Sequence, residues 1–196
     1  MDRDATGEAN TSASRALKSA LKSQYHAALA MLREAIEKCP DALWASDEYT
    51  NRFWRIAYHA LYFMHLYLQP TVHDFRPWEH HQTSIQDMDD VPSPPDIMDL
   101  TELPHRPPQT GEPYSKARVL EYWELCDAMI DDSVDRLDVF ALDSGFSWYK
   151  IPKIEHQMVN LRHIQHHTGQ LTDRIRNEAS MGVDWAGARG RRQFPG

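Results

Sequence analysis

Four segments of the chain carry apolar residues at steps of three and four positions, the spacing of a buried helix face. This pattern predicts helices over 12–38, 50–69, 115–140 and 152–178. Pro40 and Pro70 follow the first two segments as stops, and Pro152 fits a first helical turn, where no amide donor is needed. No stretch alternates with the period of two that a half-buried strand requires, so no strand is expected.

These four helices define the expected fold. Helices of this length within 196 residues predict an all-α domain over 12–180, built as a four-helix bundle. The second segment is apolar on nearly every side, which predicts that most of its surface is buried. Residues 1–11 are polar and are expected to be a disordered tail, and residues 181–196 are expected to be a short C-terminal tail.

Residues 70–113 interrupt the helical pattern between the second and third helices. Nine of the twelve prolines lie in this Pro-rich insertion, and no helical or strand period survives there. A connection of this length is uncommon in a compact domain unless it is mobile or functional. Two interpretations stand, a flexible linker or an ordered lid. The lid interpretation rests on apolar residues that could pack on the domain, namely Phe75, Trp78, Ile85, Met88, Val91, Ile97 and Leu100.

Composition and charge narrow the classes of partner. The formal net charge of −8 argues against a nucleic-acid-binding surface. The longest apolar run, residues 56–68, contains two histidines and is too short and too polar to span a bilayer, so no membrane contact is expected. Cys39 and Cys126 share no CxxC spacing, which favours reduced thiols. No signal sequence opens the chain, and the expected location is the cytoplasm.

His163 and His167 have a spacing that suits metal binding. Four residues apart on a helix, their side chains lie one turn apart on one face, where both can bind a single ion. His156 and Gln170 fall on the same side. This histidine stripe is either a solvated face or the wall of a polar cleft, and its lack of Lys and Glu favours the cleft. The opposite side is predicted to face the core, with Ile154, Met158, Leu161, Ile164, Thr168, Leu171 and Ile175.

His59 lies in the most apolar predicted helix, beside Ile56 and Phe63. An imidazole loses its hydrating water there unless it finds a partner. It is either a core histidine bonded to a carbonyl or a tyrosine, or a third ligand for the pair on the fourth helix. Three imidazoles would leave one position open for water or substrate. The histidines without a partner at metal-binding spacing are expected at the surface or in loops: His26, His80, His81 and His105.

Two stretches resemble a known family. HIQHHTGQL, residues 163–171, is similar to the His-x-x-His-His-x-Gly-Gln signature of the DinB-like superfamily. RIAYHALYF, residues 55–63, resembles that family's second mark, a histidine inside an apolar helix, and the order and separation of the two stretches agree. The resemblance covers about residues 12–69 and 115–178. Thr168 stands where many members carry Arg.

The resemblance implies a helical bundle of up-down-down-up type, often a homodimer, that holds a divalent ion through three histidines. By position the ligands are His59, His163 and His167, and His166 is the extra histidine of the signature, turned away from the ion or supporting a ligand. The expected ion is zinc, with nickel, iron and manganese as alternatives. Members include S-transferases and isomerases that use low-molecular-weight thiols, and many members have no assigned activity.

Three functions follow from these expectations. The first is a metal-dependent S-transferase, in which the ion binds a small-molecule thiol and lowers its pKa. In that case Gln170 orients a ligand or bonds the outer nitrogen of a histidine, and His156 supports the site or exchanges protons. The second is a non-catalytic, stress-related dimer that the ion stiffens. The third is a metal-dependent hydrolase with a hydroxide in the open position.

Overall fold

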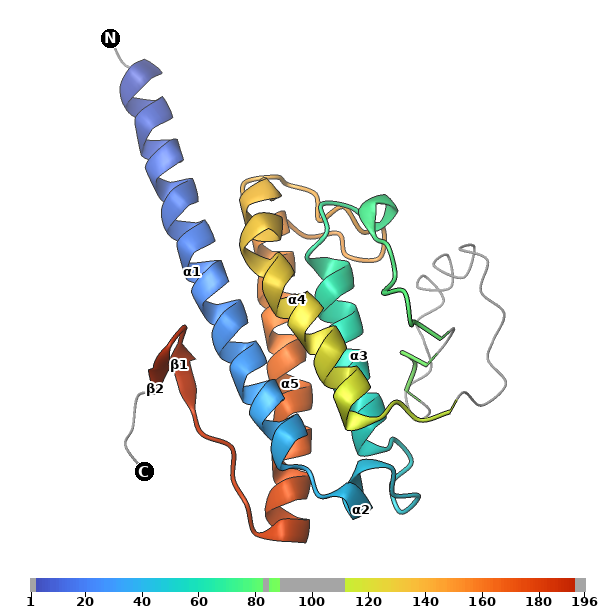
Figure 1. The fold of residues 1–196 in the computed structure, drawn as a ribbon. Coiled ribbons are helices and arrows are strands. Elements are labelled where there is room, and N and C mark those ends of the chain that lie inside the picture. Colours follow the sequence, from blue (N-terminus) through green and yellow to red (C-terminus); the bar gives the residue numbers. More distant parts are fainter. Residues whose placement is uncertain (1–2, 83–84, 89–111, 193–196) are drawn as a thin grey trace.

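The chain is mostly helical, as the periodicity predicts (Figure 1). The computed structural model describes residues 3–82, 85–88 and 112–192. Its elements are α1 (Arg3–Lys38), α2 (Asp41–Trp44), α3 (Phe53–Tyr67), the 3-10 helix η1 (Val72–Asp74), α4 (Lys116–Arg136), α5 (Lys153–Ala179), β1 (Ala186–Ala188) and β2 (Arg191–Arg192). Except at the start of α1, the long helices begin and end within a few residues of the bounds that the sequence predicts.

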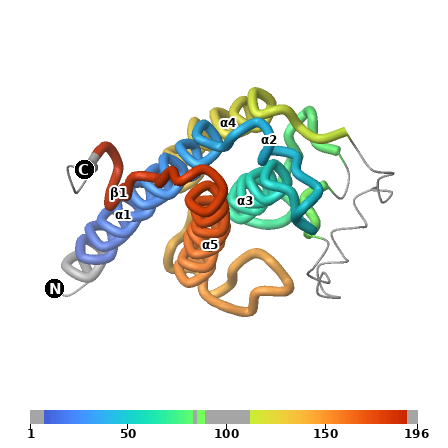
Figure 2. The backbone as a smooth tube through the Cα atoms, turned by 90° about the horizontal axis from the view of Figure 1, so that it is seen from below, coloured from blue at the N-terminus to red at the C-terminus, as the bar shows by residue number. Residues whose placement is uncertain are grey.

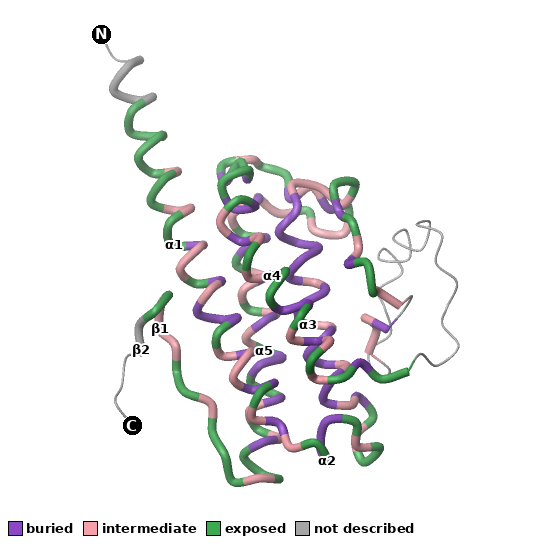
Figure 3. Tube along the Cα trace, viewed as in Figure 1, coloured by how far each residue is buried: buried purple, intermediate pink, exposed green. Residues whose placement is uncertain are grey.

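The four long helices pack side by side around one core. α1 and α5 run in one direction, and α3 and α4 run in the opposite direction (Figure 1). α4 and α5 each contact both α1 and α3, and the end-on view of Figure 2 shows α5 beside α3. Twelve of the fifteen residues of α3 are buried, as its continuous apolar run predicts (Figure 3). α3 and α5 therefore share an extensive buried interface.

The start of α1 differs from the expectation. The helix begins at Arg3, so the prediction of a disordered tail over 1–11 is wrong from that residue onward. Residues 3–20 contain no proline and are rich in alanine, the residue with the highest helix propensity. The low hydrophobicity that indicated disorder is equally typical of a helix end with no neighbour to pack against, and this end projects beyond the other helices (Figure 1).

The C-terminal segment contains a short hairpin, although the sequence predicts no strand. β1 pairs with β2 in the antiparallel sense, and Gly190 takes a φ of 67° at the turn between them. Strands of three and two residues are too short to show an alternating pattern, so periodicity could not reveal them. The segment runs back along α1, where Gln24 Nε2 donates to the Gly187 carbonyl (3.1 Å).

The buried face of α5 agrees only in part with the one that its apolar residues predict, since Ile164, Thr168, Leu171 and Ile175 are buried as expected. Met158, expected in the core, is 54% exposed. Polar side chains outside the expected face are buried as well, namely His156, Gln157, Asn160 and His167. Buried polar groups are tolerated where they find hydrogen-bond partners, and two of these amides donate to carbonyl oxygens of α3. The helix is therefore rotated so that His156, His163 and His167 face α3.

The described part of the Pro-rich insertion packs on the helices. Phe75, Trp78 and Ile85 are buried, and Met88 packs against the same core. Trp78 stacks on Tyr122 of α4 with ring centroids 4.7 Å apart. For these residues the expectation of packing on the domain is confirmed. Val91, Ile97 and Leu100 lie outside the described residues.

Two further expectations concern the whole chain. Cys39 and Cys126 are both buried and free, so neither forms a disulfide. No helix among the residues that the structure describes combines the length and the apolar character needed to cross a membrane.

Gly145 tests the packing of the α4–α5 connection. Its φ is +83°, and a Cβ at this position would overlap the Pro70 carbonyl oxygen, which also accepts a hydrogen bond from Lys153 Nζ (2.6 Å). We expect Gly145→Ala to lower the free energy of unfolding in urea by about 2 kcal/mol or more, through backbone strain and this overlap. Gly169→Ala is the matched control. Gly169 is helical with open space around it, so that variant should be unchanged or more stable by up to about 1 kcal/mol. Equal stability of the two variants would contradict this packing.

Candidate metal centre

Three histidines from two helices meet between α3 and α5. His59 lies in the middle of α3, and His163 and His167 lie one turn apart on α5. His163 Nε2 lies 3.0 Å from His59 Nε2 and 3.1 Å from His167 Nε2. The three ring centroids are 4.5 to 4.9 Å apart. The structure thus brings together the three residues that the sequence singles out, with the same ring nitrogen of each pointing inward.

The outer nitrogens of two rings fix their tautomers. His59 Nδ1 lies 2.5 Å from the Gln86 carbonyl oxygen, and His167 Nδ1 lies 2.8 Å from Gln170 Oε1. Oxygen acceptors require a proton on each Nδ1, so the Nε2 atoms of both neutral rings carry lone pairs. His163 can offer its own Nε2 proton to only one of these lone pairs. At the centre of the neutral cluster, Nε2 lone pairs therefore outnumber N–H donors. Such an excess of lone pairs favours the binding of a cation.

The spacing of the nitrogens fits a first-row divalent ion. Zinc binds imidazole nitrogen at about 2.0–2.1 Å, so two tetrahedral ligand nitrogens lie about 3.3 Å apart. The observed separations of 3.0 and 3.1 Å need only a small opening to reach that value. Three nitrogens in this arrangement fit zinc and other imidazole-binding metals, and they leave a fourth position free.

The His163 ring stays neutral at ordinary pH. Burial is the largest of the effects that lower the pKa of His163 to about 2, and the neighbouring histidine rings act in the same direction. Metal ligands must be deprotonated, so a proton does not compete for His163 under physiological conditions.

The surroundings of the cluster combine apolar cover with partial access. Phe63 contacts two of the rings, with centroids 4.7 Å from His59 and 5.5 Å from His163. Gln86, in the Pro-rich insertion, covers His59 through its carbonyl. His167 is 6% exposed, whereas His59 and His163 are of intermediate burial. The cluster is therefore mostly covered, while His59 and His163 keep part of their surface exposed.

The three residues predicted to support the ligands lie in different environments. Gln170 accepts the hydrogen bond from His167, the outer-nitrogen contact that its spacing predicts. His166 is exposed and turned away from the centre, its ring 5.0 Å from that of His167. His156 is fully buried two turns from His163, among the rings of Tyr67, Phe146 and Tyr149, which lie 4.7 to 5.0 Å away. His156 therefore does not contact the cluster in this structure, because helical spacing gives its face but not its depth.

His65 is a buried histidine outside the cluster, and it makes stability depend on pH. Its Nδ1 lies 3.0 Å from the Tyr122 hydroxyl, and burial lowers its pKa to about 4. In the unfolded chain an ordinary histidine titrates near about 6.5. Between these two values the unfolded state binds the extra proton, so the native state loses stability as the pH falls.

We expect the contribution of His65 to cost up to about 3 kcal/mol of stability as the pH falls from about 6.5 to about 4. Urea denaturation across this range measures the slope. His65→Gln keeps a group that can bond Tyr122 but cannot be protonated. The variant should therefore lose less stability over this pH range than the parent, by up to about 3 kcal/mol. Identical slopes for the two proteins would show that His65 is not held neutral by burial.

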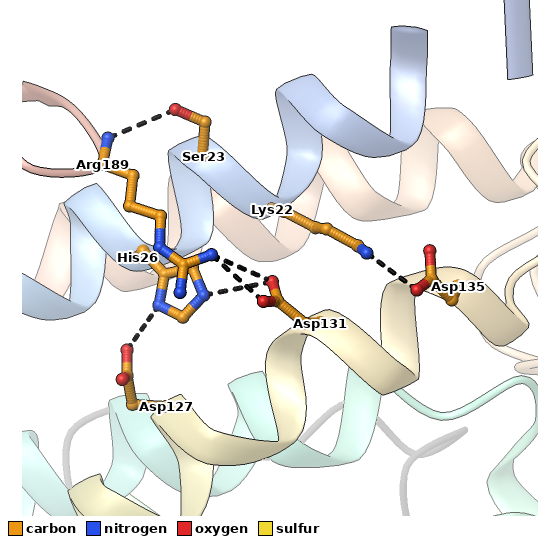
Figure 4. Close-up of polar contacts among 7 residues, drawn as sticks. All are labelled: Lys22, Ser23, His26, Asp127, Asp131, Asp135 and Arg189. Atoms are coloured by element: carbon orange, nitrogen blue, oxygen red, sulfur yellow. Dashed lines mark hydrogen bonds and ion pairs between the residues drawn. The ribbon is translucent and has the colours of Figure 1, made fainter. Parts of the chain in front are cut away.

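Another histidine, His26, has partners that the sequence does not reveal (Figure 4). Its Nδ1 lies 2.7 Å from Asp127 Oδ1 and its Nε2 lies 3.3 Å from Asp131 Oδ1. Arg189 Nη1 binds the same Asp131 at 3.0 Å and so ties the C-terminal hairpin to α4. The expectation of a surface or loop position is wrong for His26. Its acidic partners are about a hundred residues away in the sequence, and no local spacing could indicate them.

A groove of about 780 Å³ runs beside His26 and Asp127, between α1, α4 and the C-terminal hairpin. His26, Trp123 and Arg189 are among its lining residues. None of the three histidines that converge between α3 and α5 is among them, so the groove and the candidate metal centre are separate features.

Two further histidines, His80 and His81, follow η1. His81 Nδ1 lies 2.6 Å from the Tyr58 hydroxyl, and His80 Nε2 lies 3.6 Å from carboxylate oxygens of both Glu79 and Glu121. The expected loop position is confirmed for His80 and His81. Carboxylates beside an exposed histidine are typical of an ordinary surface ion pair. His105 lies outside the described residues.

Comparison of the chain with family models, with curated proteins and with solved structures finds no match. The geometry of the three histidines and of the residues that surround them is therefore the basis for inferring a function.

Proposed function

We propose that the chain is a divalent-metal-binding protein of the DinB-like superfamily, with the ion held by His59, His163 and His167. The convergence of the His59 and His167 Nε2 atoms on that of His163, at 3.0 and 3.1 Å, carries this proposal. The helix directions support it as well, because α1 and α5 run opposite to α3 and α4, which is an up-down-down-up order. The Pro-rich segment between α3 and α4 is then an insertion into a four-helix bundle. Zinc is the expected ion, and nickel, iron and manganese suit the same ligands.

The activity that this site supports best is the transfer of a low-molecular-weight thiol. A divalent ion with one open position binds a thiol sulfur and lowers its pKa, so that a thiolate nucleophile exists near neutral pH. The chain's own residues hold the site in shape. Gln86 and Gln170 keep the protons of His59 and His167 on Nδ1, and Phe63 excludes water from one side. Cys39 and Cys126 are buried and have raised pKa values, so the nucleophile must be a separate thiol.

Two measurements on protein purified without a histidine tag test this function. Elemental analysis should find about one divalent ion per chain. Bacillithiol, mycothiol and glutathione, each offered with an electrophilic chloroarene, should reveal whether thiolate displaces chloride at a rate that chelation abolishes. A bound ion that stabilises the fold without thiol-dependent turnover would favour the non-catalytic stress-related protein. Turnover of ester substrates without a thiol would favour the metal-dependent hydrolase. Protein without any bound ion would contradict the proposal.

Two related expectations stay predictions. A homodimer is expected from the family resemblance, and light scattering of the purified protein measures its mass. A cytoplasmic location is expected from the sequence, and fractionation of the source cells measures it.

A further inference from the structure

Two amides on the buried face of α5 bind α3 directly. Gln157 Nε2 donates to the Tyr67 carbonyl (3.0 Å), and Asn160 Nδ2 donates to the Met64 carbonyl (3.2 Å). Both side chains are completely buried. Because these bonds join side chains of one helix to the backbone of the other, they fix how far α5 is rotated and shifted against α3. The metal centre lies in the same interface, three residues along α5 from Asn160 and six from Gln157.

The amide oxygens of these two side chains differ in their partners. Gln157 Oε1 accepts a hydrogen bond from the Tyr25 hydroxyl at 2.8 Å. Among the residues that the structure describes, Asn160 Oδ1 has no hydrogen-bond partner although it is buried. The donation to Met64 fixes which end of the amide is which, because the carbonyl oxygen of Met64 cannot bond Oδ1. A buried acceptor is therefore left unsatisfied on this face of α5.

A buried nitrogen lies one turn away. His163 Nδ1 also has no hydrogen-bond partner among the described residues. Residues 160 and 163 are three positions apart, which makes them neighbours on one helix face. Helical side chains lean toward the N-terminus of their helix, so the ring of His163 lies over the turn that carries Asn160. The unsatisfied oxygen and the unsatisfied nitrogen thus belong to neighbouring side chains on one face of α5.

The other two rings of the cluster indicate a role for Asn160 Oδ1 beside His163 Nδ1. His59 Nδ1 and His167 Nδ1 each lie against an oxygen acceptor, the Gln86 carbonyl and Gln170 Oε1. Such contacts at the outer nitrogen hold a metal-binding imidazole in the correct tautomer and orientation. Only His163 lacks one, although its Nε2 occupies the middle of the cluster.

We propose that Asn160 is the positioning residue of His163. When His163 Nε2 binds a cation, its proton must sit on Nδ1, and Asn160 Oδ1 accepts that proton in a hydrogen bond after a rotation of the two side chains. Asn160 Nδ2 keeps its bond to Met64. One buried amide then connects the central ligand to the backbone of the helix that carries His59, so both helices hold the same ring. This inference rests on the proposed metal site.

The test compares two near-isosteric variants, each of which removes a buried amide that donates to a carbonyl of α3. Asn160→Leu also removes the acceptor for His163, whereas Gln157→Met does not. Competition with a chromophoric chelator should show that Asn160→Leu weakens Zn²⁺ binding by about ten- to hundredfold. Gln157→Met should stay within about threefold of the parent. Asn160→Asp retains the oxygen, and we expect it to bind at least tenfold more tightly than Asn160→Leu.

A second readout separates positioning from general stability. The visible absorption bands of bound Co²⁺ should shift in Asn160→Leu and not in Gln157→Met, because only the first variant frees the central ring. If the Asn160 variants do not fold, ¹H–¹⁵N spectra of the zinc-loaded parent still test the contact. The Nδ1 proton of His163 should be protected from exchange and close to the Asn160 side chain.

The outcomes distinguish the role of Asn160 from the existence of the metal site. Equal Zn²⁺ affinities and Co²⁺ spectra for Asn160→Leu and Gln157→Met would overturn the role of Asn160 and leave the metal site intact. A Nδ1 proton of His163 that exchanges rapidly would overturn it as well. A parent protein that binds neither Zn²⁺ nor Co²⁺ would overturn the metal site itself.

Discussion

His163→Ala is expected to weaken Zn²⁺ binding more than any other single substitution outside the folding core. His163 Nε2 lies within 3.1 Å of both other inward-pointing nitrogens, so its removal leaves two ligands on different helices. Loss of a residue that only supports a ligand costs about ten- to hundredfold in metal affinity, and the loss of a ligand should exceed the upper value. Competition with a chromophoric chelator measures this affinity.

His166→Ala is the matched control for that variant. It removes an imidazole from the same helix, three residues away, whose ring is exposed and turned from the centre. Its Zn²⁺ affinity should equal that of the parent. If the two alanine variants bind Zn²⁺ equally well, the ion is held elsewhere and the site is wrongly assigned.

Removal of the ion should lower the stability of the whole fold. The ligands come from α3 and α5, so an ion between them is bound only by the folded chain. At a free Zn²⁺ concentration a thousandfold above the Kd, binding stabilises the native state by about 4 kcal/mol. For a domain of this size each kcal/mol shifts the melting temperature by roughly 2–4 °C. Calorimetry with Zn²⁺ and with excess EDTA should therefore differ by about 10 °C.

The same experiment on His59→Ala supplies the control. That variant lacks the ligand from α3, so Zn²⁺ can no longer join the two helices and its melting temperature should be nearly independent of EDTA. A parent protein whose melting temperature does not respond to Zn²⁺ would contradict a cation site between α3 and α5.

The helices were predictable because each long one keeps a regular apolar face. α3 and α5 match the predicted ranges closely, with Pro152 immediately before α5 and Pro70 soon after α3. The start of α1 was not predictable by the same means. An exposed helix end has no buried face, so residues 3–11 show neither a period nor a strong stop signal.

The orientation of α5 required tertiary structure. Its apolar residues indicate one core-facing side, yet Met158 is exposed while Gln157 and Asn160 are buried. Those two amides are stable inside because backbone carbonyls near the end of α3 accept their hydrogen bonds. A sequence pattern gives no sign of such acceptors, since every residue carries the same backbone groups.

The candidate site was partly predictable. Helical spacing pairs His163 with His167, and the family resemblance adds His59, which periodicity alone leaves as either a core residue or a ligand. The contact of Gln170 with His167 also follows from spacing. The Gln86 carbonyl could not be anticipated, because it comes from an irregular segment that approaches α3 only in the folded chain. For the same reason, the depth of His156 in the core could not be read from its position on the helix.

X-ray absorption at the zinc edge tests the central claim most directly. Untagged, zinc-loaded protein should give one ion per chain with about three imidazole nitrogens at roughly 2.0–2.1 Å. His59→Ala should reduce the number of imidazole nitrogens and the amount of zinc retained. A parent spectrum dominated by oxygen ligands, or one that His59→Ala leaves unchanged, would contradict a shared cation between the two helices.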